Sequence, residues 1–134
     1  MQRILLGATF AAALALTIAA CGDGDNNSPT GPSGGGGGGT IAATIVIGAD
    51  GAVSPATATV PVGSRVTFTN NHNAPHNMNS DPHPEHTQCP AINVGTLQPG
   101  QSRTSENLTT ARACGFHDHD LPTNAALRGT ITVQ

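Results

Sequence analysis

The sequence contains no tryptophan and no tyrosine, and only three of its 134 residues are phenylalanine. A domain with so few large side chains has little apolar area to bury, so it would benefit from a covalent or metal cross-link. The chain is mildly acidic, with a formal net charge of -3. Its folded part has arginines but no lysine and no basic patch, so the composition argues against nucleic acid as a partner.

An apolar segment lies at the N-terminus. Arg3 precedes residues 4–20, which are rich in leucine and alanine, and this order of a positive region and a short hydrophobic region is typical of a signal peptide. The segment ends in IAAC, with the cysteine at position 21, which resembles the lipobox of bacterial lipoproteins. The resemblance implies cleavage before Cys21 and lipidation of that cysteine. The alternative is a plain secretory signal followed by an incidental cysteine.

Residues 22–39 include six consecutive glycines and offer no apolar side chain to a core, which predicts a flexible tether. A lipid on Cys21 would then hold the protein on a membrane surface without spanning the membrane. Gly22 and Asp23 do not look like an inner-membrane retention signal. In a cell with two membranes we therefore expect the outer membrane, with the domain facing the periplasm or the cell surface.

Residues 40–134 should form one folded domain of about 95 residues. No stretch has a sustained apolar period of 3.6, whereas short β-branched segments alternate with Gly, Pro and Asn turns. The segments predicted as strands are 41–47, 57–62, 65–69, 101–108, 110–116 and 128–133, and residues 70–90 are predicted as a loop. This spacing predicts an all-β sandwich.

Cysteine supplies a possible cross-link. If Cys21 carries lipid, Cys89 and Cys114 remain in an exported, oxidising setting, where a disulfide is the simple expectation. It would close a loop of about 25 residues, worth roughly 3–4 kcal/mol on the chain-entropy model. However, Cys114 also begins the segment CGFHDHD, in which a thiolate could be a metal ligand beside two histidines.

The order of several segments resembles the cupredoxin family, the plastocyanin-like blue-copper domains. These segments are SPATATVPVGSRVTFTNN (54–71), APH (74–76), GTLQPGQS (95–102) and LRGTITV (127–133). The resemblance covers nearly all of residues 41–133. It implies a Greek-key β-sandwich, with a metal site at one end formed by the loop after the Phe68 strand and the loop before the final strand.

The resemblance also implies ligands. His76 matches the first histidine ligand of the family, and the other ligands are a cysteine, a second histidine and an axial methionine in the last loop. Cys114 has family spacings to both His117 and His119, but Leu127 stands at the methionine position. If Cys114 is the thiolate ligand, the protein is a true type 1 electron carrier.

A different alignment follows from Phe116. Typical members have an aromatic residue two positions before the ligand cysteine, and here that alignment places Asp118 at the thiolate position. Side chains repeat every two residues along a strand, so Cys114, Phe116 and Asp118 would share one face. We favour this alignment because it leaves Cys114 free to pair with Cys89.

All six histidines lie between residues 72 and 119. His83 and His86 precede Cys89, so the disulfide would hold them beside the histidines that follow Cys114. A site made of imidazole and carboxylate would be a type 2-like copper site, with zinc or nickel as possible occupants. The predicted metal ligands are His76, His83, His86, His117, His119 and Asp118.

The leading hypothesis is an exported, lipid-anchored cupredoxin-like protein that binds copper for copper holding, delivery or electron relay. Its expected partners are the membrane, through the anchor, and a redox or copper-handling protein. The alternatives are the type 1 carrier that uses Cys114 and a metal-free sandwich that binds a protein partner. An enzyme is not expected, because the sequence has no glycine-rich phosphate loop and no nucleophile with a placed base.

Overall fold

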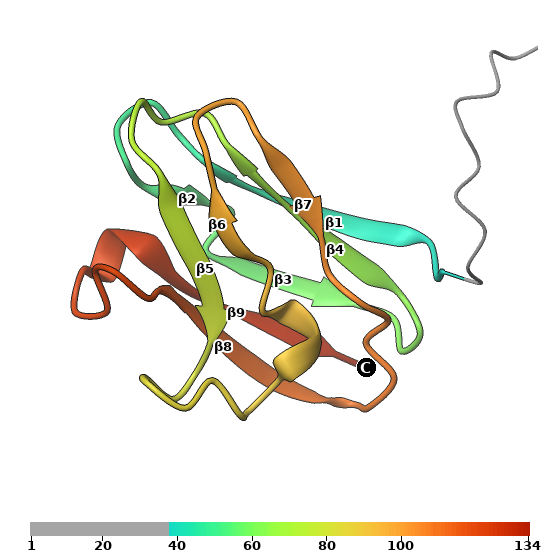
Figure 1. Cartoon of the computed structure of the whole chain (residues 1–134). Helices are drawn as coiled ribbons and strands as arrows, with labels where there is room; N and C mark the ends of the chain where they lie inside the picture. Colours follow the sequence, from blue (N-terminus) through green and yellow to red (C-terminus); the bar gives the residue numbers. More distant parts are fainter. Residues whose placement is uncertain (1–37) are drawn as a thin grey trace, which may run out of the picture. The chain divides into compact units, whose positions relative to one another are not determined.

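A computed structural model describes residues 38–134, which form a two-layer β-sandwich (Figure 1). One sheet has the strand order β2-β1-β4-β7, and the other has the order β3-β9-β8-β5-β6. The strands are β1 (Ile41–Ile47), β2 (Val53–Ser54), β3 (Thr57–Val60), β4 (Arg65–Asn70), β5 (His76–Ser80), β6 (Gly95–Leu97), β7 (Ser102–Thr104), β8 (Arg112–Asp118) and β9 (Arg128–Val133). Two short 3-10 helices, η1 (Pro90–Ile92) and η2 (Ala125–Leu127), lie in the connections.

The predicted signal peptide, Cys21 and most of the predicted tether lie outside the described residues. Gly39, the last residue of that tether, donates its backbone N–H to Asn107 Oδ1 at 2.7 Å. Contacts of the domain therefore begin slightly before the predicted boundary at Thr40. Within the described part of the chain, no helix has the length and apolar character needed to cross a membrane.

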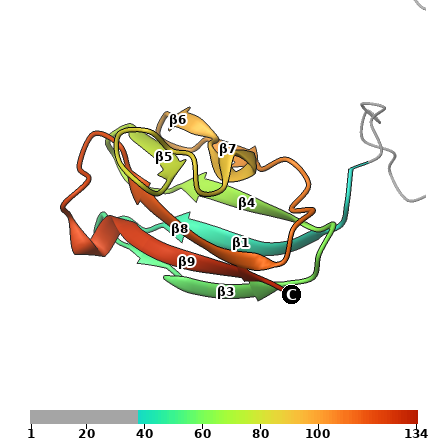
Figure 2. The ribbon, with the colours of Figure 1, turned by 90° about the horizontal axis from the view of Figure 1, so that it is seen from below.

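Both sheets are mixed. β1 pairs in parallel with β4, and β3 pairs in parallel with β9, which lies beside it in Figure 2. β8 is the central strand of the five-stranded sheet and forms antiparallel pairs with β5 and β9. Because β8 is held from both sides, the side chains that it carries are fixed on defined faces of the sheet.

The core lies between the two sheets. β4 alternates between buried and half-buried residues, as expected for a strand with one face inward, and this alternation buries Val66 and Phe68. Phe68 meets Phe116 of β8 edge to face, with ring centroids 5.4 Å apart, so these two rings join the sheets. Gly129 is opposite Phe116 in β9, where a Cβ atom would lie 2.4 Å from the Phe116 ring. The small core therefore depends on one aromatic pair and on a glycine that makes room for it.

The all-β sandwich prediction is confirmed, but the prediction of a continuous loop over residues 70–90 is wrong. β5 has the sequence HNMNS, which lacks the apolar alternation that indicates a strand. Its inward residues, His76, Met78 and Ser80, are all buried even though two of them are polar. β5 therefore fills a strand position next to β8 through pairing that the sequence pattern does not indicate.

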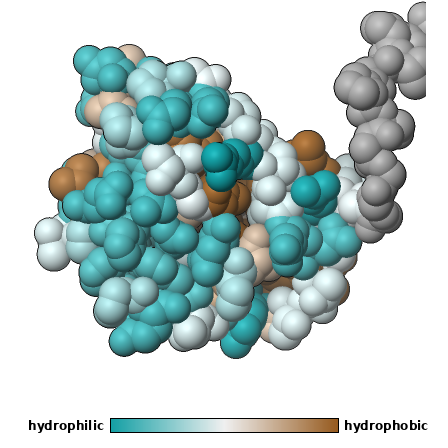
Figure 3. Space-filling model, viewed as in Figure 1, coloured by the Kyte–Doolittle hydropathy of each residue, from teal (hydrophilic) through white to brown (hydrophobic). Residues whose placement is uncertain are grey.

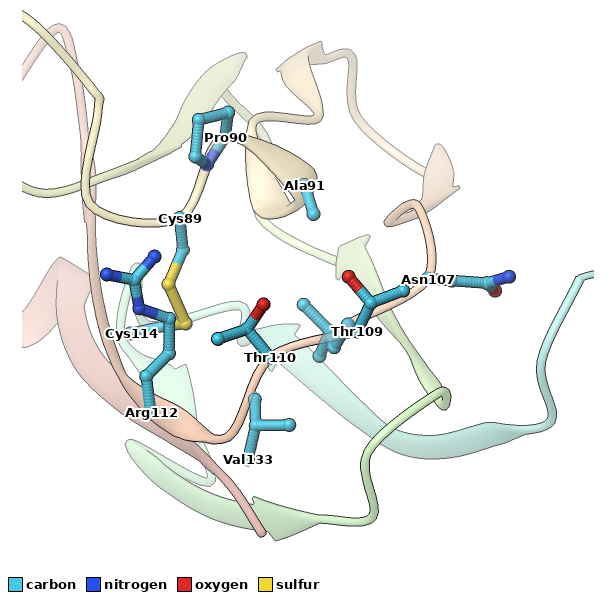
Figure 4. A pocket seen from close by; sticks show the side chains of 10 residues that line it. Cys89, Pro90, Ala91, Asn107, Thr109, Thr110, Arg112, Cys114 and Val133 are labelled. Atoms are coloured by element: carbon cyan, nitrogen blue, oxygen red, sulfur yellow. A yellow bond between two sulfur atoms is a disulfide. The ribbon is translucent and has the colours of Figure 1, made fainter.

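The predicted disulfide is present between Cys89 and Cys114, with Cα atoms 5.6 Å apart (Figure 4). Cys89 ends the segment 81–89, which follows β5, and Cys114 lies in β8. Both cysteines are buried. The bond therefore anchors the far end of this segment to the central strand.

The surface seen in Figure 3 is mainly hydrophilic, and apolar residues show there only as small areas. Three large apolar side chains of the described residues are exposed, namely Ile41, Val62 and Leu121. They come from β1, from the turn after β3 and from the segment after β8. Their spread along the chain gives no reason to define a broad apolar docking surface.

Candidate metal centre

The two faces of β8 carry different chemistry. Met78 is opposite Asp118 in the β5–β8 pair, and Ser80 is opposite Phe116, so Asp118 shares the interior face with the core. His117 is opposite Asn79 and faces the other side of the sheet. His117 is nevertheless only 1% exposed, because the segment 81–89 lies against it.

His83, His86 and His117 come together on this outer side. Each offers one potential ligand atom, and these atoms lie within 4.8 Å of one another. His119 lies alongside, with its Nδ1 3.1 Å from His86 Nε2 and its ring centroid 4.8 Å from that of His83. We call these four residues the outer histidine cluster. Imidazole is a donor that suits copper, zinc and nickel, so the cluster could hold a metal ion.

Hydrogen bonds to the backbone of His86 fix the segment that carries His83 and His86. The His86 carbonyl accepts hydrogen bonds from Ser80 Oγ at 2.9 Å and from Asn93 Nδ2 at 3.0 Å. The His86 N–H donates to the Pro82 carbonyl at 2.7 Å. His86 has a φ of 53°, in the left-handed region where histidine is among the enriched non-glycine residues. These bonds hold an unusual backbone conformation and thereby orient the His86 ring.

His117 is oriented by a carboxylate. Its Nδ1 lies 2.7 Å from Asp81 Oδ1, and because a carboxylate can only accept, Nδ1 carries the proton of this hydrogen bond. In the neutral ring, Nε2 is then left with a lone pair. Nε2 is buried and has no hydrogen-bond partner in the described part of the protein. A carboxylate behind one histidine nitrogen and a free second nitrogen is the arrangement that histidine metal ligands usually have.

Gly115 makes this arrangement possible. A Cβ atom at position 115 would lie 2.2 Å from Asp81 Oδ2, so any side chain there would displace the carboxylate. The Asp81 N–H also donates to the Gly115 carbonyl at 2.9 Å. Asp81 therefore sits directly over β8, close to His117.

The surroundings of His86 disfavour its charged form. The pKa of His86 is lowered from its ordinary value of 6.5, first by burial and then by repulsion from His119, His117 and His83. Nearby Glu85 opposes the shift. The cluster therefore favours a neutral His86, which is the form that binds a metal.

The structure places His76 and Asp118 elsewhere, on the interior side of β8. His76 Nδ1 is 2.6 Å from Asp118 Oδ2, and both residues are buried. His76 Nε2 is 2.8 Å from Nδ1 of half-buried His72. Asp118 Oδ1 accepts from the backbone N–H groups of Asn77 and Asp120, each at 3.1 Å. We call His72, His76 and Asp118 the inner hydrogen-bond chain.

The six predicted ligands are therefore divided between two locations. His83, His86, His117 and His119 meet in the outer cluster, whereas His76 and Asp118 bond to each other on the opposite face of the sheet. Both ring nitrogens of His76 have partners within the protein, unlike Nε2 of His117. Metal binding by His76 or Asp118 stays a prediction, and it would require these hydrogen bonds to open.

The sequence does not indicate Asp81 as a site residue. It lies two residues before His83 and more than thirty before His117, and nothing in SDPHPEH distinguishes it from an ordinary loop carboxylate. Its role follows only from the pairing of β5 with β8, and β5 itself was not predicted.

Comparison with known proteins identifies the class of fold. No family model and no curated protein sequence matches the chain. A purple cupredoxin from Nitrosopumilus maritimus matches 69% of this chain and 99% of its own, with 25% identity and a TM-score of 0.56. An oxidized plastocyanin from Dryopteris crassirhizoma matches 68% and 99%, with 22% identity and a TM-score of 0.52. A Cu(I) form of an amicyanin variant matches 71% and 82%, with 21% identity and a TM-score of 0.51.

These neighbours are consistently cupredoxins, and the described domain is a cupredoxin-like β-sandwich. The resemblance expected from the order of the sequence segments is therefore confirmed. Neighbours of this class are also consistent with the expectation that the protein is not an enzyme.

Proposed function

We propose that this protein binds copper through the outer histidine cluster. The observation that carries the proposal is His117 Nε2, a buried nitrogen without a hydrogen-bond partner among the described residues. Leaving such an atom unsatisfied costs about 1–3 kcal/mol. A metal ion shared with His83 and His86 would supply the missing partner, and Asp81 already holds His117 in the tautomer that binding requires.

The donor set favours a type 2-like copper site. Imidazole nitrogens without a thiolate suit Cu(II), and copper lies at the top of the divalent affinity order. The purple cupredoxin and the amicyanin structures support copper as the metal to test first. The alternative type 1 site has less support, because Cys114 is bonded to Cys89 and faces the interior, away from His117.

The proposal places this copper site at the cell envelope. The signal-like segment and the cysteine at position 21 support a lipid-anchored protein on the outer membrane, facing the periplasm or the surface. Its role would be copper holding, delivery or electron relay, with a redox or copper-handling protein as partner. A metal-free binding module is less favoured, because it leaves His117 Nε2 without a ligand.

A Cu(II) titration of the purified protein, followed by absorbance and EPR, tests the site. We expect binding of about one copper per chain with a type 2 spectrum. His83→Ala should abolish tight binding, because it removes one of the three potential ligands of the cluster. His83 is exposed, so this substitution leaves the core intact. His72→Ala is the matched control, because it removes a histidine of the inner hydrogen-bond chain.

Two results would contradict the proposal. An intense band near ~600 nm would show copper–thiolate bonding and would make Cys114 a ligand. Absence of tight binding by the unaltered protein would leave a metal-free sandwich.

A further inference from the structure

A pocket opens beside the outer histidine cluster. It has a volume of about 440 Å³, within the range of roughly 300–1,000 Å³ typical of small-molecule sites. His83 and His117 form its wall toward the cluster. Pro82, Pro122 and Thr123 contribute a largely apolar surface. A molecule in this pocket would lie next to the histidines that the proposed function assigns to copper.

Arg128 gives the pocket a positive charge. It is directly opposite His117 in the β8–β9 pair, so the two side chains share the outer face of the sheet. Its guanidinium lies 3.9 Å from Asp81 Oδ2, and its side chain remains 49% exposed. Among residues 38–134, no other carboxylate lies within ion-pair distance of Arg128. The guanidinium therefore has N–H groups available to a ligand in the pocket.

The charge balance depends on the metal. Without a metal, the single negative charge of Asp81 offsets the positive charge of Arg128. Asp81 also accepts a hydrogen bond from His117 through Oδ1. It therefore has little capacity to neutralise a metal ion in addition to Arg128. A bound divalent ion would add two positive charges beside Arg128. The metal-loaded pocket would then attract an anion, whereas the metal-free pocket would attract it only weakly.

We propose that this pocket binds a small organic carboxylate, which ligates the metal with one oxygen while Arg128 pairs with the carboxylate group. The proposal rests on the proposed copper site. A carboxylate matches the fork of N–H donors on arginine, and oxygen is an acceptable ligand for Cu(II). The proline walls favour an organic acid over a bare inorganic anion, because they can cover an apolar group.

Benzoate is the probe for the test, with benzamide as the uncharged compound of the same shape. Copper-loaded protein is titrated with each compound, by calorimetry and by following the Cu(II) absorption and EPR spectra. We expect benzoate to bind and to change the copper spectrum, and benzamide to bind much more weakly. Arg128→Gln should weaken benzoate binding roughly tenfold or more, at unchanged copper content, because it removes the charged donor. Arg112→Gln, at an exposed arginine outside this pocket, is the control and should leave binding unchanged.

The outcomes separate the two proposals. If the protein binds no copper, the proposed function fails and the carboxylate site fails with it. If copper binds but benzoate does not, the copper site stands and the carboxylate site is wrong. Equal benzoate affinity in the Arg128→Gln variant, or in the copper-free protein, would also overturn the carboxylate site.

Discussion

At the scale of single residues, the outer histidine cluster depends on Asp81. This carboxylate holds His117 Nδ1, lies against Gly115 and is near Arg128. A carboxylate behind a ligand histidine fixes the tautomer and raises the basicity of the ring. Asp81 can therefore control metal affinity without contacting the metal.

Asp81→Asn tests this role. The amide is uncharged and accepts a weaker hydrogen bond, so the His117 ring would be held less firmly and would be a weaker metal ligand. We expect copper affinity to fall by about 10–100-fold, measured by competition with a chelator of known affinity. Asp120→Asn is the control, because Asp120 is an exposed carboxylate whose hydrogen bond to Asp118 is donated by its backbone N–H. Equal affinities in the two variants would show that Asp81 has no such role.

The lowered pKa of His86 predicts how the stability of the metal-free protein changes with pH. Because the folded state disfavours protonated His86, the unfolded chain takes up this proton more readily. Above pH 6.5 His86 is neutral in both states, so its titration does not lower the free energy of unfolding. As the pH falls below that value, protonation of His86 favours the unfolded chain and the free energy of unfolding decreases.

His86→Asn removes the titrating ring and keeps a residue type that tolerates the left-handed backbone. Free energies of unfolding in urea at about pH 7.5 and about pH 5.5 provide the measurement. We expect acidification to destabilise the unaltered protein more than the variant. The same loss in both proteins would mean that His86 does not contribute to the pH dependence.

At the scale of elements, the segment 81–89 acts as a cover attached to β8 at both ends. Asp81 N–H donates to the Gly115 carbonyl, and Gly115 N–H donates to Gln88 Oε1, each at 2.9 Å. The Cys89–Cys114 bond then closes the far end. Together these contacts bring His83 and His86, which lie more than thirty residues away in sequence, against His117.

Replacing both cysteines by alanine tests this attachment. Loss of the disulfide should reduce the free energy of unfolding by roughly 3–4 kcal/mol, because the unfolded chain regains the entropy of a 25-residue loop. Copper affinity should also fall, since His83 and His86 would no longer be held near His117. Denaturation and copper titration measure the two effects separately. Reduced stability with unchanged copper affinity would show that hydrogen bonds alone position the segment.

At the scale of the whole molecule, the fold was more predictable from the sequence than the arrangement of the site. Strands such as 41–47 and 128–133 were predictable because β-branched residues and turn signals mark them. β5 was not, because HNMNS is polar and its inward residues are buried by pairing with β8. That omission also hid the division of the histidines. His76 and His117 lie on opposite faces of the sheet. The sequence could not show this, because His76 was predicted to lie in a loop, and a loop residue cannot be assigned to a face of a sheet.

The proposed location at the cell envelope depends on the N-terminal segment, and Cys21 is the residue that tests it. If the letters IAAC mark a lipobox, the thiol of Cys21 is the atom that receives lipid, and a serine there cannot be processed in the same way. We expect the unaltered chain, expressed in a bacterial host, to incorporate labelled fatty acid and to fractionate with membranes. Cys21→Ser should not incorporate the label, because it lacks the thiol that receives the lipid. Cys89→Ala, which leaves the lipobox intact, should keep the label. Labelling that persists in Cys21→Ser would contradict lipidation at this position. If the unaltered protein is instead unlabelled and found in the soluble fraction, the N-terminal segment is a plain secretory signal.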